Sequence, residues 1–168
     1  MNVKTATIDL LEINTDTFDM DKTEYMVWLG NKGVHLTIVT RLESLWEATR
    51  NLGEKTIYIG RIIIAKIVEF IEDHPHAVIG MAIGAIVGAF ASAFPFLGAL
   101  LAPLAMAVGA AYGYCAGARL DYDKNAAPNN EFETLILIAK DFIKTLIEIF
   151  STLKETLFGE NDGKIKNS

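Results

Sequence analysis

The pattern of apolar and polar positions changes abruptly in the middle of this chain. Between Ala77 and Ala118 there is no Asp, Glu, Lys or Arg, whereas charged residues occur throughout the segments on either side. Pro95 divides this uncharged block, because a proline inside a helix removes a hydrogen bond and costs about 3 kcal/mol or more. The block therefore predicts two apolar helices, over 77–94 and 96–118, joined by a tight turn.

Each half of the block approaches the length needed to cross a bilayer. A spanning helix needs about 20 apolar residues for about 30 Å of hydrocarbon, and the two halves correspond to roughly 27 Å and 34 Å. The turn between them carries no charge, and charged segments lie at both outer ends. We therefore expect a transmembrane hairpin over 75–118, in a bacterial inner membrane, with both termini cytoplasmic. The alternative is a soluble protein that buries the hairpin beneath its own helices.

Small residues recur at every fourth position in both predicted helices. Glycine inside a helix costs about 1 kcal/mol relative to alanine in water, but in a bilayer it lets two helix backbones approach closely. Packing within one hairpin and contact between subunits both use such rows. We predict that the following residues form the packing rows: Gly80, Gly84, Gly88 and Ser92 in the first half, and Ala105, Gly109, Gly113 and Gly117 in the second.

The segments before the hairpin mix polar and apolar positions. Residues 1–33 are acidic and rich in turn-forming residues, and we expect a partly ordered arm in which 5–13 form either a strand or a helix. Over 34–73 the apolar residues recur at helical spacing. This spacing predicts two amphipathic helices, the first of which ends near Gly53, a residue type favoured after the end of a helix.

The segment after the hairpin contains the widest apolar stripe. We expect a polar linker over 119–130, an amphipathic helix over 131–158 and a disordered tail over 159–168. A stripe of this width must be buried against protein or lie on lipid. We predict a face for self-association or for a partner protein, formed by Leu135, Ile138, Phe142, Leu146, Ile149 and Leu153.

A proline separates the second amphipathic helix from the apolar block. Pro75 disfavours helical geometry at His74 and suits the first turn of a new helix, so we expect a break or kink here. His74 and His76 flank this proline, but two imidazoles lack the further ligands that a metal site needs. We interpret both histidines as capping and membrane-interface residues that are sensitive to pH near 6.5.

Composition and charge exclude several classes of function. The chain is 51% hydrophobic and 21% charged with a formal net charge of −6, which argues against a nucleic-acid-binding surface. The acidic N-terminal segment predicts no cleavable secretion signal. No phosphate-binding loop, nucleophile elbow or metalloprotease motif occurs, and the single Cys115 forms no intrachain disulfide. We expect no enzymatic activity, no cofactor and no metal.

The block carries two motifs, Gly80-x3-Gly84-x3-Gly88 and Gly109-x3-Gly113-x3-Gly117. These motifs resemble the glycine-zipper hairpins of small pore-forming and membrane-inserting proteins. The block is also similar to the buried hydrophobic hairpin of pore-forming colicins, which is rich in Ala and Gly and flanked by amphipathic helices. The resemblance is architectural, and it implies no individual functional residues.

These patterns together predict an all-α membrane protein, with a two-span helical hairpin flanked by amphipathic cytoplasmic helices. We expect the protein to self-associate in the lipid bilayer as a pore or a permeabilising assembly. One alternative is a non-conducting membrane adaptor of a bacterial or phage secretion, toxin or defence system, which docks a cytoplasmic protein partner through its flanking helices. A further alternative is a soluble helical protein that inserts on a trigger.

Overall fold

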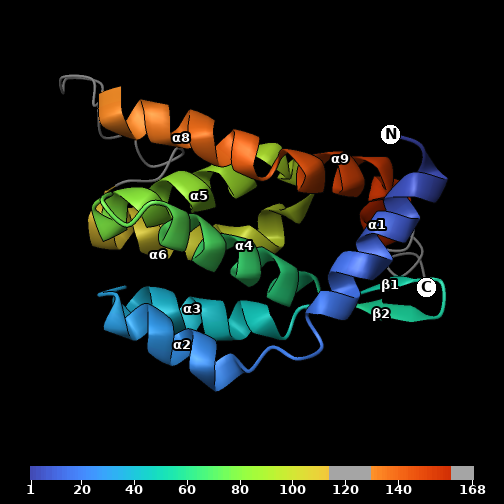
Figure 1. The fold of residues 1–168 in the computed structure, drawn as a ribbon, viewed down its shortest axis with the longest axis horizontal. Coiled ribbons are helices and arrows are strands. Elements are labelled where there is room, and N and C mark those ends of the chain that lie inside the picture. The colour runs from blue at the N-terminus through green and yellow to red at the C-terminus, as the bar shows by residue number, and fades with distance from the viewer. Residues whose placement is uncertain (114–129, 160–168) are drawn as a thin grey trace.

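A computed structural model describes residues 1–113 and 130–159, which are mostly helical (Figure 1). The first part of the chain forms α1 (Val3–Asp16), α2 (Lys22–Asn31), α3 (Leu36–Trp46), the strands β1 (Arg50–Leu52) and β2 (Lys55–Ile57), and α4 (Ile59–Asp73). The second part forms α5 (Ile79–Ala93), the 3-10 turn η1 (Pro95–Leu97), α6 (Gly98–Tyr112), α8 (Asn130–Phe142), α9 (Lys144–Thr152) and the π-helical turn η2 (Glu155–Gly159).

The helices are arranged in layers around the uncharged block. α8 runs along one side of α5, α4 and α6 contact its other sides, and α3 and α2 follow beyond them (Figure 1). α1 crosses one end of these layers, where it contacts α9 and α4 close to the β-hairpin. α5 therefore lies in the interior of the molecule.

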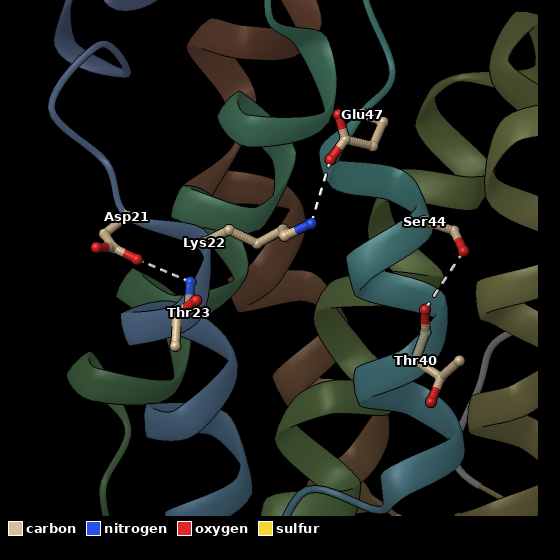
Figure 2. A network of polar contacts seen from close by, with 6 residues as sticks. All are labelled: Asp21, Lys22, Thr23, Thr40, Ser44 and Glu47. Carbon is tan, nitrogen blue, oxygen red and sulfur yellow. Dashed lines mark hydrogen bonds and ion pairs between the residues drawn. The ribbon is translucent and has the colours of Figure 1, made fainter.

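Residues 1–33 form two capped helices, which corrects the expectation of a partly ordered arm. The side chain of Asn2 accepts a hydrogen bond from a backbone N–H group in the first turn of α1. The side chain of Asp21 does the same for the Thr23 N–H in the first turn of α2 (Figure 2). Such caps satisfy donors that have no partner within the helix. α1 buries few apolar side chains, among them Ala6 and Leu10, so its sequence pattern is weak and packing against other elements stabilises it.

α2 and α3 are neighbours joined by a tight turn. Gly33 has a φ of +90°, and the Val34 N–H donates to the Leu29 carbonyl at 3.1 Å, which closes the end of α2. The Lys22 ammonium lies 3.3 Å from a carboxylate oxygen of Glu47 at the far end of α3 (Figure 2). An exposed ion pair contributes at most about 1 kcal/mol, so apolar packing is the main link between these helices.

The first amphipathic helix ends at Trp46, well before the expected position near Gly53. Residues 50–57 form a β-hairpin in which Leu52 pairs with Lys55. Gly53 has a φ of +64° in the two-residue turn, and glycine at the first turn position is typical of such hairpins. The glycine that indicated a helix end in the sequence therefore belongs to a β-turn.

A buried polar residue of α1 fastens this β-hairpin to the helices. The Asn14 amide nitrogen donates to the Thr56 carbonyl at 2.9 Å, and its amide oxygen accepts from the Tyr58 N–H at 2.8 Å. Buried amides are found where both of their polar atoms have partners. Asn14 thereby positions the start of α4, which follows β2.

The break expected before the apolar block is confirmed. α4 ends at Asp73, and His74 has φ −128° and ψ 59°, outside the helical region. The Ala77 N–H donates to the His74 carbonyl at 3.1 Å and closes a turn around Pro75. Because of this turn, α5 begins only at Ile79. We expected Pro75 to lie in the first turn of the apolar helix, and it lies before that helix instead.

The C-terminal segment is helical but is interrupted, in contrast to the single regular helix that we expected. α8 and α9 meet at Ile143, which has φ −99° and ψ 13°. The Ile143 N–H still donates to the Ala139 carbonyl at 3.1 Å, so the two helices follow one another in a row (Figure 1). Apart from their end residues, the expected linker and the expected tail lie outside the described residues.

Candidate functional site

The first helix of the apolar block is enclosed by the rest of the chain. All eleven consecutive residues from Gly80 to Phe90 are buried, and α4, α6 and α8 contact the helix. A surface helix keeps a polar stripe toward water, and α5 has no such stripe because it has no water-facing side over these residues.

The second helix has the same uncharged character but is buried on one face. Leu101, Leu104 and Val108 are buried, whereas Met106 is 73% exposed. The spacing of the exposed residues follows one side of a helix. This exposed apolar face consists of Ala99, Ala102, Pro103, Met106 and Ala110.

Within the described residues, one stretch is long and apolar enough to cross a membrane. It runs from Pro95 to Tyr112 with a mean hydropathy of 1.6, and 33% of it is buried. α5 is apolar but has 15 residues, about 22 Å, which is short of about 30 Å of hydrocarbon. A core helix of a soluble protein meets the same criterion, so length and composition alone do not identify a membrane span.

The first predicted glycine row lies mostly inside the core. Gly80, Gly84 and Gly88 are buried. A Cβ atom added at Gly80 would lie 2.7 Å from Cδ1 of Tyr112, so the tyrosine ring occupies the space that a side chain would need. Ser92 departs from the prediction: it is exposed, and its hydroxyl donates to a carbonyl of its own helix at 3.3 Å.

The second predicted row is interrupted by the end of α6. Gly109 is buried and Ala105 is half-buried. Gly113 has a φ of +74° and closes the helix, with its N–H donating to the Gly109 carbonyl at 2.8 Å. Glycine reaches this left-handed conformation without steric cost, so Gly113 is a helix end and not a packing residue. Gly117 and Cys115 lie outside the described residues.

The face predicted for self-association is largely used within the chain itself. α8 lies against α5, and α9 lies against α1. A hydrophobic stripe indicates that a face is covered but not what covers it, so a role of this face in self-association or partner binding stays a prediction. Ile138 is 41% exposed, and the other five residues are buried or half-buried: Leu135, Phe142, Leu146, Ile149 and Leu153.

Aromatic contacts hold the turn of the hairpin against the C-terminal helices. The ring centroids of Phe94 and Phe150 are 5.3 Å apart, and those of Phe96 and Phe158 are 5.0 Å apart. Phe94 and Phe150 are fully buried, and such pairs contribute about 0.5–1.5 kcal/mol beyond their buried area. The sequence does not predict these contacts, because the partners are far apart in the chain.

The two predicted histidines differ in their surroundings. Nδ1 of His74 lies 2.7 Å from the Phe70 carbonyl oxygen, and its ring centroid is 4.2 Å from that of Phe70. His76 is exposed. Over residues 1–113 and 130–159, no group of three or more His, Cys, Asp or Glu side chains is placed to hold a metal ion. The proposed sensitivity of both histidines to pH stays a prediction.

Comparisons of this chain with protein-family models, with curated proteins and with solved structures gave no match. The α5–α6 hairpin is therefore the candidate functional element. One of its helices is enclosed, the other has an exposed apolar face, and both of its ends contact distant segments of the chain.

Proposed function

We propose that this protein permeabilises membranes by delivering its α5–α6 hairpin to a lipid bilayer, where several copies assemble. In the fold described above, the hairpin is stored among the protein's own helices. The observation that carries the proposal is the burial of α5 over eleven consecutive uncharged residues. This proposal joins the expected permeabilising assembly with the expected soluble form that inserts on a trigger.

The helices that cover α5 support an exchange of protein for lipid. α4 and α8 lie against α5, and both are amphipathic. In a bilayer the backbone hydrogen bonds of α5 remain satisfied within the helix, and amphipathic helices are stable at the lipid interface. A charged side chain at the centre of a bilayer costs about 2.5–3.5 kcal/mol on insertion scales, and the hairpin has none.

α6 supports the same proposal from the outside of the molecule. Its exposed apolar face is able to meet lipid before any helix separates. α5 is shorter than the hydrocarbon thickness, and the uncharged residues Ala77 and Val78 precede it. We expect α5 to lengthen through these residues on insertion, or the bilayer to become thinner around it.

The test is release of a self-quenched dye from vesicles of phosphatidylcholine, with and without phosphatidylglycerol. Met106→Asp places a carboxylate on the exposed face of α6, and we expect it to reduce the release rate about tenfold or more. The matched control is Leu137→Asp on α8, because Leu137 is 67% exposed and Met106 73%. We expect this control to release dye within about twofold of wild type, since α8 remains outside the hydrocarbon.

The outcomes separate the possible functions. Equal release by the two variants would contradict the hairpin as the inserting element. Wild-type protein that binds vesicles without releasing dye would favour the non-conducting adaptor, and protein that does not bind vesicles would contradict the proposal. Self-association is measured as particle mass in detergent after extraction from the vesicles, and a monomer there would contradict the assembly.

A further inference from the structure

The side chain of Tyr112 lies at the open end of the hairpin, where α5 starts and α6 ends. It connects this open end to the turn between α2 and α3. Tyr112 is the last residue of α6, and its ring packs against Gly80 at the start of α5. Its hydroxyl accepts a hydrogen bond from the His35 N–H at 2.8 Å and donates one to the Gly33 carbonyl at 3.3 Å. A tyrosine hydroxyl is both donor and acceptor, so one oxygen satisfies two backbone groups of the turn.

The turn that receives this hydroxyl is held in place by its own hydrogen bonds. Gly33 has a φ of +90°, and the Val34 N–H donates to a carbonyl in the last turn of α2 at 3.1 Å. Immediately afterwards, Nδ1 of His35 accepts from the Thr37 N–H at 3.2 Å and caps α3. Two helix ends therefore fix the backbone on either side, and they present the Gly33 carbonyl and the His35 N–H at a fixed separation.

The opposite end of the hairpin is held by different forces. Phe94 and Phe150 are fully buried there, and separating them would expose apolar surface to water. Tyr112 is half-buried, and water is able to replace both of its hydrogen bonds, so their net contribution is modest. Close to the Tyr112 end of the hairpin, Leu36 and Val78 are 77% and 64% exposed. These two side chains therefore add little packing that would resist opening at that end.

From these contacts we propose that Tyr112 acts as a clasp: its hydroxyl holds the start of α5 and the end of α6 against the turn between α2 and α3. The hairpin opens first at the Tyr112 end, with the aromatic end as the hinge. The role of this opening in membrane delivery rests on the proposed function. The clasp itself is a property of the protein in water, and it is tested there first.

The test is amide hydrogen exchange measured by mass spectrometry in buffer without lipid. Tyr112→Phe keeps the ring on Gly80 and removes the hydroxyl. We expect amides of residues 104–112 and 79–84 to exchange about two- to tenfold faster than in wild type, which corresponds to the loss of one net hydrogen-bond contribution. Amides of residues 132–142 in α8 should exchange at the wild-type rate.

The matched control is Tyr25→Phe on α2, because within the described residues no hydrogen bond involves the Tyr25 hydroxyl. We expect wild-type exchange over 79–84 and 104–112 in this variant. The clasp is overturned if Tyr112→Phe exchanges like wild type at both segments, or if exchange rises equally in all helices. If Tyr112→Phe does not fold, Gly80→Ala must give the same two-segment acceleration, because the added methyl group displaces the ring.

The vesicle assay then separates this inference from the proposed function. We expect Tyr112→Phe to release dye about two- to tenfold faster than wild type, and Tyr25→Phe to match wild type. If no protein releases dye, the proposed function fails and the exchange result still decides the clasp. If wild type releases dye while Tyr112→Phe is unchanged in both assays, the clasp alone fails.

Discussion

α5 and α6 have 15 residues each and no charged side chain, yet their surroundings differ. α5 is covered on all sides from Gly80 to Phe90, whereas α6 exposes 73% of Met106. Both helices are apolar by composition. Their places are decided by the number of covering helices, because α4 and α8 both lie against α5.

The difference between the two helices has a consequence for the proposed delivery. α6 is able to contact lipid in the folded protein, but α5 must first lose its neighbours. The free energy of that step depends on core packing around α5 and on the contacts at the two ends of the hairpin. Variants in α5 and α6 test this difference directly, and variants in α2 provide a reference outside the hairpin. The expected effects range from unfolding to a shallow change with pH.

The largest contrast is expected from a carboxylate placed in each helix. Ile86 is fully buried, so Ile86→Asp should lower the free energy of unfolding by more than about 4 kcal/mol, since the carboxylate has no partner there. Met106→Asp on the exposed face should change it by no more than about 0.5 kcal/mol. Urea unfolding followed by circular dichroism measures both, and similar losses would contradict the enclosure of α5.

A smaller contrast is expected from adding one methyl group to a glycine of each helix. Gly80→Ala should destabilise the fold by about 1–3 kcal/mol, because the methyl group would overlap the Tyr112 ring. Gly98→Ala meets no atom within 4 Å, and it should be neutral or stabilising by up to about 1 kcal/mol. Thermal unfolding of the two variants checks the sign, and a stabilising Gly80→Ala would place Tyr112 elsewhere.

The polar outer layer should respond less than the buried positions of α5. Lys22→Ala removes the exposed ion pair with Glu47 between α2 and α3. We expect a loss of no more than about 1 kcal/mol, which diminishes further in about 1 M salt because exposed charges are screened. Urea midpoints at low and high salt provide the measurement, and a larger, salt-independent loss would mean that Lys22 has a packing role.

The smallest expected effect is a dependence on alkaline pH. Burial raises the pKa of Tyr25 above its ordinary value of 10.0, and the charges of Glu69, Glu72 and Glu24 raise this pKa further. The Tyr25 hydroxyl therefore keeps its proton to a higher pH in the folded protein than in the unfolded chain. As a result, stability is lost as pH rises above about 10. Tyr25→Phe should unfold with a shallower decline above pH 10. An equal decline in both proteins would contradict the shift.

Several elements were predictable because their signals are local. The uncharged block, the break at His74 and the amphipathic character of α4 follow from residue type and spacing. The N-terminal helices and the β-hairpin at 50–57 were not predictable in this way. α1 has a weak apolar pattern, and Gly53 suits a helix end as well as a β-turn, so contacts such as those of Asn14 decided between the alternatives.

The amino-acid pattern alone predicts that residues 77–118 form an uncharged block, that Pro95 divides this block, and that the flanking helices have one apolar face. These properties depend on side-chain chemistry and helical periodicity, which are present before the chain folds. Three features depend on the folded arrangement: α5 is enclosed, Gly113 ends a helix, and most of the stripe on α8 and α9 packs within the chain. They depend on it because the hydrophobic effect is non-directional: it favours covering an apolar face, and the packing geometry selects which element covers that face.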